Sequence, residues 1–207
     1  MYALVEDGSI SKLITNPKSM VIGDVRYPAK IFQLWSGSEL NAIGIYEVIT
    51  DSTNKKDEKW YINTNESYAF ADNQVTRSWG TATPKAHADS LWTQQDSDDG
   101  DLPSDKSVGD VKVEGLKTQL IRTIKQQASG LLAPTDWYVV KASEVSDYSV
   151  PTNIATYRAS VRTKSNEMET AITNASNTPA LETLYTYTKQ EDGTVTRPLG
   201  ELPTLEI

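Results

Sequence analysis

Short apolar segments separated by turn residues occupy the first third of the chain. Apolar positions flank Asp7-Gly8, a dipeptide suited to the type I′ turn of a β-hairpin, and Asp72-Asn73 offers a second turn. The β-branched and aromatic residues that favour strands are concentrated in segments 45–50, 60–63 and 66–70. Several short strands at close spacing predict a β-rich module over residues 1–83, folded as a small sheet or a barrel-like unit.

Two short helices are also expected in the first half. Ser36 stands three residues before Glu39, which is the spacing of a capping box at a helix N-terminus. The segment PKAHADSLW, which begins at Pro84, has a composition compatible with a second short helix. Residues 94–105 follow it; they are acidic, contain Gly and Pro, and lack periodic apolar positions, so residues 84–109 are predicted to be a short helix and an acidic linker.

Apolar positions recur every three or four residues in the second half, as they do on one face of a helix. The first stripe comprises Val113, Leu116, Leu120, Ile124, Ala128 and Leu131 or Leu132, and the second comprises Ile154, Tyr157, Val161, Met168, Ile172 and Ala175, with Lys164 in one slot. Gly130 and Pro134 mark the end of the first helix, and Pro151 suits the start of the second. Residues 110–177 are therefore predicted to form a helical hairpin.

The segment between the two stripes reads LLAPTDWYVV and contains the most distinctive residues of the chain. We expect Thr135 to cap a short helix that follows it. Trp137 is expected to fill the corner between the two long helices, and Asp136 either to cap or to pair with an arginine. Arg158 and Arg162 lie one helical turn apart, so they either occupy a solvated face or bridge to a carboxylate such as Asp136 in a bidentate ion pair.

The end of the chain has few apolar positions. Residues 180–188 suit a helical turn that leads into a strand, and Asp192-Gly193 suits another hairpin turn. The final segment, PLGELPTLEI, has no core of its own and is expected to be disordered or docked on a neighbour. Residues 178–207 thus form a β/extended tail. The fold class is α+β: a small β-rich N-terminal module, a helical-hairpin module and an extended C-terminal tail.

Composition argues against several classes of function. The net charge of −8 argues against a nucleic-acid or anionic-membrane surface, which needs clustered Lys and Arg. Cysteine is absent, so disulfides and thiolate metal sites are excluded. No apolar run is long enough to span a membrane, and the first residues lack the pattern of a signal peptide. Ten Tyr and five Trp against two Phe favour interfaces, where an apolar ring with a polar group is useful.

Catalytic and metal-binding motifs are not found. His87 is the one histidine and has no spacing partner for a triad, so we expect it to face solvent or to bond locally. The acidic cluster at Asp96, Asp98, Asp99 and Asp101 fails the calcium-loop template, which needs Gly at the sixth position and Glu at the twelfth. We therefore expect no enzyme activity, no cofactor and no metal. Sugar binding by Trp and Tyr remains an alternative.

The corner segment and the helix after it resemble a known module. Leu132, Thr135, Asp136 and Trp137, then Pro151, then Tyr157, Arg158, Val161 and Arg162, follow the order of the TDW–YR helical module of phage tail-fibre assembly and tail-assembly-chaperone proteins. This resemblance covers about residues 110 to 180. The segments MYALVEDGSISKLI, GDVRYPAKIFQLWSGSELNAIGIYEV and WYINTNESYAF look like the first part of tail-associated proteins of marine and cyanobacterial phages.

The resemblance implies a non-enzymatic structural protein of a bacteriophage tail, in the baseplate or tail-fibre region. A transient tail-fibre or tail assembly chaperone is the alternative, and a carbohydrate-binding receptor module is the third possibility. Simple assembly chaperones end soon after the YR helix, whereas this chain continues. The implied partners are other tail, baseplate or fibre proteins in a multi-copy assembly, located in the virion tail and, during assembly, in the host cytoplasm. The implied interface contains Asp136, Trp137, Tyr157, Arg158 and Arg162.

Overall fold

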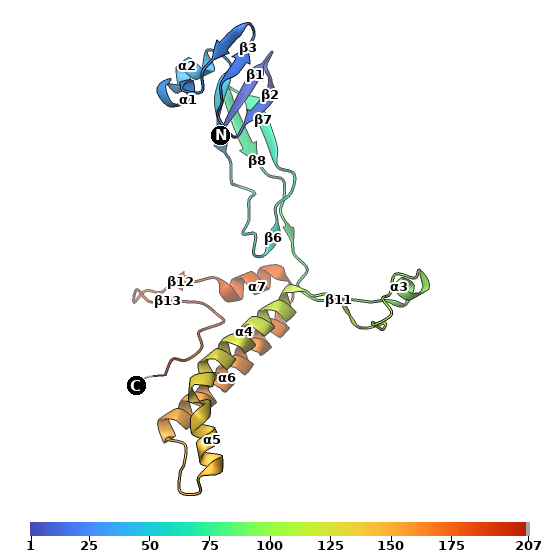
Figure 1. Cartoon of the computed structure of the whole chain (residues 1–207), viewed down its shortest axis with the longest axis vertical. Helices are drawn as coiled ribbons and strands as arrows, with labels where there is room; N and C mark the ends of the chain where they lie inside the picture. Colours follow the sequence, from blue (N-terminus) through green and yellow to red (C-terminus); the bar gives the residue numbers. More distant parts are fainter. Residues whose placement is uncertain (206–207) are drawn as a thin grey trace. The chain divides into compact units, whose positions relative to one another are not determined.

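The computed structural model describes residues 1–205 and divides the chain into two compact units, Met1–Thr83 and Pro84–Ile207. Strands dominate the first unit and helices the second, so the fold is α+β (Figure 1). No helix in residues 1–205 is long and apolar enough to cross a membrane.

A five-stranded sheet in the order β2-β1-β5-β8-β7 forms the centre of the first unit. Its strands are β1 (Tyr2–Glu6), β2 (Ser9–Ile14), β5 (Ile45–Thr50), β7 (Ser67–Ala71) and β8 (Gln74–Ser78). Neighbours are antiparallel except for β5 and β8, which run parallel. Asp7 and Gly8 have φ of 50° and 75°, and Asp72 and Asn73 have φ of 51° and 58°. Positive φ at both central residues is the type I′ geometry, which confirms the two predicted hairpin turns.

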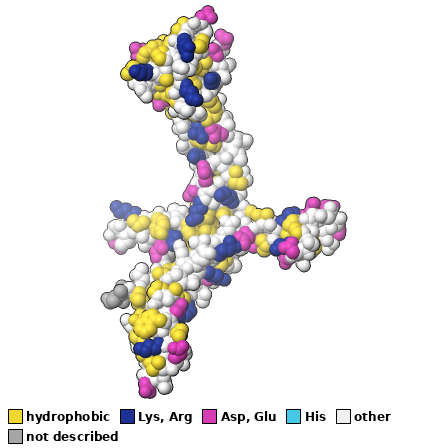
Figure 2. Space-filling view, in the orientation of Figure 1, with side chains coloured by type: hydrophobic (Ala, Val, Ile, Leu, Met, Phe, Trp, Pro, Cys, Tyr) yellow, Lys and Arg dark blue, Asp and Glu magenta, His cyan; other side chains and the backbone are white. Residues whose placement is uncertain are grey.

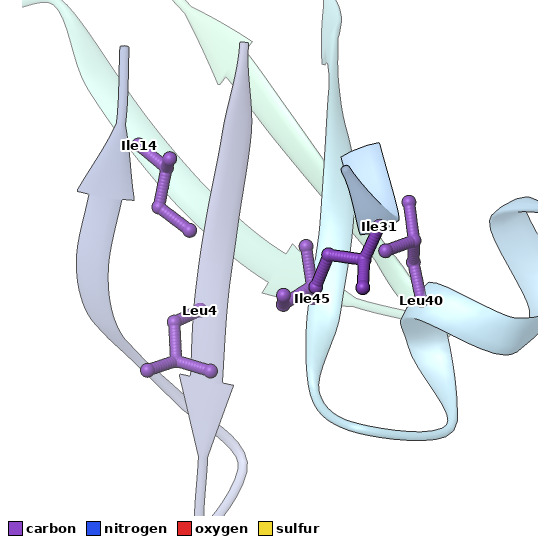
Figure 3. Packing of buried hydrophobic residues seen from close by; sticks show 5 residues of the cluster. All are labelled: Leu4, Ile14, Ile31, Leu40 and Ile45. Atoms are coloured by element: carbon purple, nitrogen blue, oxygen red, sulfur yellow. The ribbon is translucent and has the colours of Figure 1, made fainter. Parts of the chain in front are cut away.

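Both faces of this sheet are apolar, because alternate residues of β1 enter different clusters. Ala3, Val5 and Val75 form one cluster, and β2 and β7, the two end strands, contact each other around it. Of the two expected forms, a small sheet or a barrel-like unit, the structure has a sheet whose two end strands approach each other. The opposite face is covered by α1 (Ile31–Leu34) and α2 (Gly37–Asn41), which contribute Ile31 and Leu40 to a cluster with Leu4, Ile14 and Ile45 (Figure 3).

Local polar contacts explain where α2 begins. The Ser36 amide donates to Glu39 Oε2 at 2.7 Å, and the Glu39 amide donates to Ser36 Oγ at 3.3 Å. The predicted capping box is confirmed. The remaining elements of this part are short: β3 (Met20–Ile22), β4 (Val25–Tyr27), β6 (Tyr61–Ile62) and β9 (Thr83–Pro84).

Two long antiparallel helices, α4 (Leu116–Leu132) and α6 (Thr152–Asn174), form the centre of the second unit (Figure 1). The predicted stripes are confirmed at most positions: the buried apolar residues are Leu116, Leu120, Ile124 and Ala128 on α4, and Ile154, Tyr157, Val161, Met168 and Ile172 on α6. Val113 lies before the helix, in β11 (Val111–Val113), and is exposed. Ser165, rather than Lys164, takes the buried slot between Val161 and Met168.

Residues 84–109 contradict two predictions. The PKAHADSLW segment forms no helix; it contains β10 (Ser90–Leu91), which pairs with β11. Its carbonyls accept from the first amides of α4: Leu116 N donates to Ala86 O and Lys117 N to His87 O, both at 3.0 Å. The first amides of a helix have no carbonyl partner within that helix. The carbonyls of the non-helical PKAHADSLW segment are free to accept from them, whereas in a helix those carbonyls would accept from their own helix. The expected linker contains α3 (Gln94–Asp98).

The end of the chain is docked on its own helices. Leu199 is buried, and Leu202 and Leu205 pack on a cluster formed by Ala128, Tyr157 and Val161. Before it come α7 (Thr178–Tyr185), β12 (Thr188–Lys189) and β13 (Val195–Thr196), with the predicted Asp192-Gly193 turn joining the two strands. Residues 199–205 therefore cover the hairpin of the same chain. The predicted tail extends to residue 207, and its last two residues lie outside the described part.

Candidate protein-binding surface at the hairpin corner

The corner between the long helices is a change of helix direction held by polar contacts. The chain leaves α4 through a 3-10 turn, η1 (Ala133–Thr135), and enters α5 (Asp136–Glu144). Thr135 is the N-cap of α5, but its hydroxyl does not cap that helix. It donates to the Leu132 carbonyl at 2.7 Å and accepts from Arg158 Nη1 at 2.6 Å. The expected capping role is therefore wrong, because the hydroxyl is used to close the end of α4.

Arg158 connects all three elements of the corner. Its guanidinium is buried: Nη1 donates to the Leu132 carbonyl at 3.0 Å, and Nη2 lies 2.8 Å from Asp136 Oδ1. A cation at the carbonyl end of α4 and an anion in the first turn of α5 both suit the helix dipoles. Of the two alternatives for Arg158, a solvated face or a bridge to Asp136, the structure shows the bridge. The contact uses one guanidinium nitrogen, so it is not the expected bidentate pair.

Tyr157 adds a second contact to the last turn of α4. Its ring is buried in the cluster with Ala128 and Val161, and its hydroxyl donates to the Leu131 carbonyl at 3.3 Å. A helix leaves its last carbonyls unpaired, so the hydroxyl of Tyr157 and the guanidinium of Arg158 satisfy two of them. Tyr157 and Arg158 therefore fix the corner from inside.

Trp137 does not fill the corner, contrary to expectation. Its side chain is 52% exposed, and the space expected for it is occupied by Leu131 and Leu132, with Leu202 and Leu205 from the end of the chain. Arg158 draws Asp136 toward the hairpin, and the next residue on a helix points about 100° away from it. The indole consequently lies on the outside, where its ring centroid is 3.9 Å from that of Tyr138.

Helix α5 presents further apolar side chains to solvent. It buries none of its residues, and large apolar side chains are exposed along it and at its end (Figure 2). We call the following residues the α5 patch: Trp137, Val139, Val140 and Val145. The Lys141 ammonium lies 5.9 Å from the Trp137 ring centroid and 4.3 Å from that of Tyr148, so a cation borders the patch. Several large apolar side chains left exposed on one short helix, with polar groups beside them, are a feature of protein-binding sites.

A groove of about 390 Å³ adjoins the corner and is lined by residues of α4, α5 and α6. Arg158 and Asp136, which form an ion pair with each other, are among its lining residues. Arg162 also lines it, is exposed, and forms no ion pair with any residue in the described part of the chain. Lys125, also in the lining, is paired with Glu169 at 3.4 Å. Arg162 is therefore the cation of this groove that is available to an external acidic group.

The other residues considered for metal binding or catalysis make structural contacts. Asp96 binds the ammonium of Lys112, and then the hydroxyl and amide of Thr93; these contacts lower its pKa to about 2. His87 is partly buried, and its carbonyl caps α4. Residues 1–205 contain no group of three His, Cys, Asp or Glu side chains that could hold a metal.

The five residues singled out in the sequence thus separate into two sets. Asp136, Tyr157 and Arg158 hold the helices together, while Trp137 and Arg162 face solvent. Val139, Val140 and Val145 also belong to the surface, although their spacing along a short helix gave no signal beyond apolar character. No family model, curated protein or solved structure matches this chain.

Proposed function

We propose that this chain is a non-enzymatic structural component of a bacteriophage tail, in the baseplate or fibre region. The observation that carries the proposal is the α5 patch, whose four apolar side chains are 43% to 52% exposed beside a corner held by buried polar contacts. The order of the residues around it, which resembles the module of phage tail-assembly proteins, gives the partner class. Its partners are other tail proteins.

The exposed indole of Trp137 is the expected energetic centre of this contact. Covering the exposed half of a Trp side chain removes about 120 Å² of surface from water, worth about 3 kcal/mol at about 25 cal/mol per Å². Trp is among the residues that most often dominate interface energies. Because Lys141 and Arg162 lie beside the patch and the groove, a suitable partner has an apolar pocket with an acidic rim.

Quantitative mass spectrometry of purified virions, from the phage that encodes this chain, tests the proposal. A structural component is present in a fixed ratio to the other tail proteins. A transient assembly chaperone would be absent from finished particles, while its deletion would still abolish tails or fibres. Absence of the chain from virions would overturn the structural proposal, and normal tails without it would remove the chaperone alternative as well.

A variant of the patch links the surface to this role. Trp137→Ala is expected to lower the free energy of unfolding by about 1 kcal/mol or less, since half of the side chain is already in water. We expect the same variant to be lost from purified tails. Val195→Ala, a change at a similarly exposed apolar position on β13, is the control and should be incorporated normally. Normal incorporation of Trp137→Ala would show that another surface makes the contact.

A further inference from the structure

A second candidate binding site lies in the first unit, apart from the α5 patch. A pocket of about 320 Å³ opens beside α2 and the first half of β5. Two aromatic side chains line it on the face that α1 and α2 cover, those of Tyr2 and Trp35, whereas Tyr46 packs in the cluster on the other face. Four residues with amide or carboxylate side chains, Asn41, Glu47, Asn73 and Gln74, also line it. A small pocket with aromatic walls and a few polar groups is the usual form of a small-molecule site.

Strand pairing explains why the pocket is open here. Strand β5 pairs with β1 through Ile45 to Glu47 and with β8 through Val48 to Thr50. Strand β8 therefore does not extend along the first half of β5, and the turn before it leaves Gln74 at the mouth of the pocket. With its amide in the orientation that satisfies both of its polar atoms, the Asn41 side chain joins α2 to the start of β5: its nitrogen donates to the carbonyls of Gly37 at 3.0 Å and Ile45 at 2.9 Å.

Each of these two aromatic rings is fixed by a second ring. The pairs, with their centroid separations, are Tyr2 and Phe32 at 5.1 Å and Trp35 and Tyr27 at 5.8 Å. Trp35 nevertheless keeps 37% of its surface exposed. Rings that are held in place lose little freedom when a ligand stacks on them, so the pocket is preorganised for contact with an apolar face.

The lining also selects the charge of the ligand. It contains no Lys, Arg or His, so it offers no cation to a phosphate or a carboxylate. Its polar groups are amides and one carboxylate, which both donate to and accept from hydroxyl groups. We propose that this pocket binds a neutral saccharide of one or two residues, with a C–H face of the sugar on Trp35 and its hydroxyls on Asn41, Glu47 and Gln74.

The test uses the full chain, labelled with ¹⁵N, and the methyl glycosides of glucose, galactose, mannose and N-acetylglucosamine as probes at millimolar concentration. At least one probe is expected to shift the indole N–H signal of Trp35 and the amide signals of Asn41 and Gln74. Trp35→Ala should weaken binding at least tenfold. Leu34→Ala, at the adjacent exposed position outside the lining, should bind as the native chain does.

Two outcomes overturn the proposal: no shift with any of the four probes, or equal binding by the native chain and Trp35→Ala. If Trp35→Ala alters the folded spectrum, Gln74→Ala and Glu47→Gln decide instead, because both side chains lie at the surface. Each should weaken binding at least threefold, and unchanged affinity in both would refute the assignment. The result is independent of virion composition, so it can fail while the tail proposal holds.

Discussion

Removal of the Arg158 guanidinium should destabilise the helical unit far more than removal of its neighbour Arg162. Arg158 donates to the Leu132 carbonyl and to Thr135 Oγ1, and it pairs with Asp136, all from a buried position. Arg162 lies four residues later on the same helix, is exposed, and forms no ion pair with a residue in the described range 1–205. Comparing Arg158→Ala with Arg162→Ala therefore isolates the corner contacts from general effects of charge and helix propensity.

The magnitude follows from what each change leaves behind. Hydrogen bonds to a charged group contribute about 1.5–3 kcal/mol each, and Arg158→Ala removes two of them together with packed side-chain volume. We expect a loss of about 3–4 kcal/mol. Arg158→Lys keeps the positive charge but loses the planar guanidinium with its several N–H donors. We therefore expect it to lower the free energy of unfolding by about 2 kcal/mol. Asp136 is largely exposed, so Asp136→Asn should cost about 1 kcal/mol. Arg162→Ala should cost less than about 0.5 kcal/mol.

Urea unfolding followed by circular dichroism at 222 nm measures this series, because the long helices that give the signal belong to the unit containing the corner. The expected order of destabilisation is Arg158→Ala, Arg158→Lys, Asp136→Asn and Arg162→Ala. A double-mutant cycle between positions 136 and 158 isolates the ion pair. Equal destabilisation by Arg158→Ala and Arg162→Ala would refute the view that buried hydrogen bonds at the corner, rather than charge, hold α4, α5 and α6 together.

Two further predictions concern other parts of the chain. Gly44 has φ of 81°, and a Cβ there would lie 2.6 Å from the Val5 carbonyl oxygen, so Gly44→Ala should cost about 2–4 kcal/mol in thermal unfolding of the first unit. Gly8→Ala, with φ of 75° and open space around the Cβ, should cost about 1 kcal/mol; equal costs would disprove the clash. The pKa of Asp96 is about 2, below its ordinary 3.8, because of Lys112 and then Thr93. Its contribution to stability is therefore present above about pH 4 and is lost as the pH falls toward 2; a carboxyl NMR titration showing an ordinary pKa would contradict this.

Periodicity predicted the elements whose apolar residues point in one direction. The stripes of α4 and α6 needed only the helical repeat, and the turns at Asp7-Gly8 and Asp72-Asn73 needed only residues that tolerate positive φ. These signals depend only on residues close together in the chain, so a single sequence is enough to predict the helices and turns. The fold class and the order of its parts followed from them.

Predictions failed where distant residues decide the conformation. The segment from Pro84 to Trp92 has a helical composition, yet Ala86 and His87 are not helical, and their carbonyls accept from the first amides of α4. Trp137 was expected inside because a large apolar residue at a helix break usually is buried. Its place is taken by Leu202 and Leu205, which are more than 60 positions further along the sequence and show no spacing relation to it.

The same competition leaves apolar side chains exposed at the corner, as the proposed contact with a partner requires. If Trp137 filled the corner, α5 would contribute to the core and present little apolar surface. Instead Tyr157, Arg158 and the leucines of the tail complete the core without it, and the indole remains outside. A surface held by a buried guanidinium loses little entropy when a partner covers it. Arg158→Lys should therefore weaken partner binding through loss of order in α5 even though Arg158 is buried, whereas Trp137→Ala should weaken it with the corner intact.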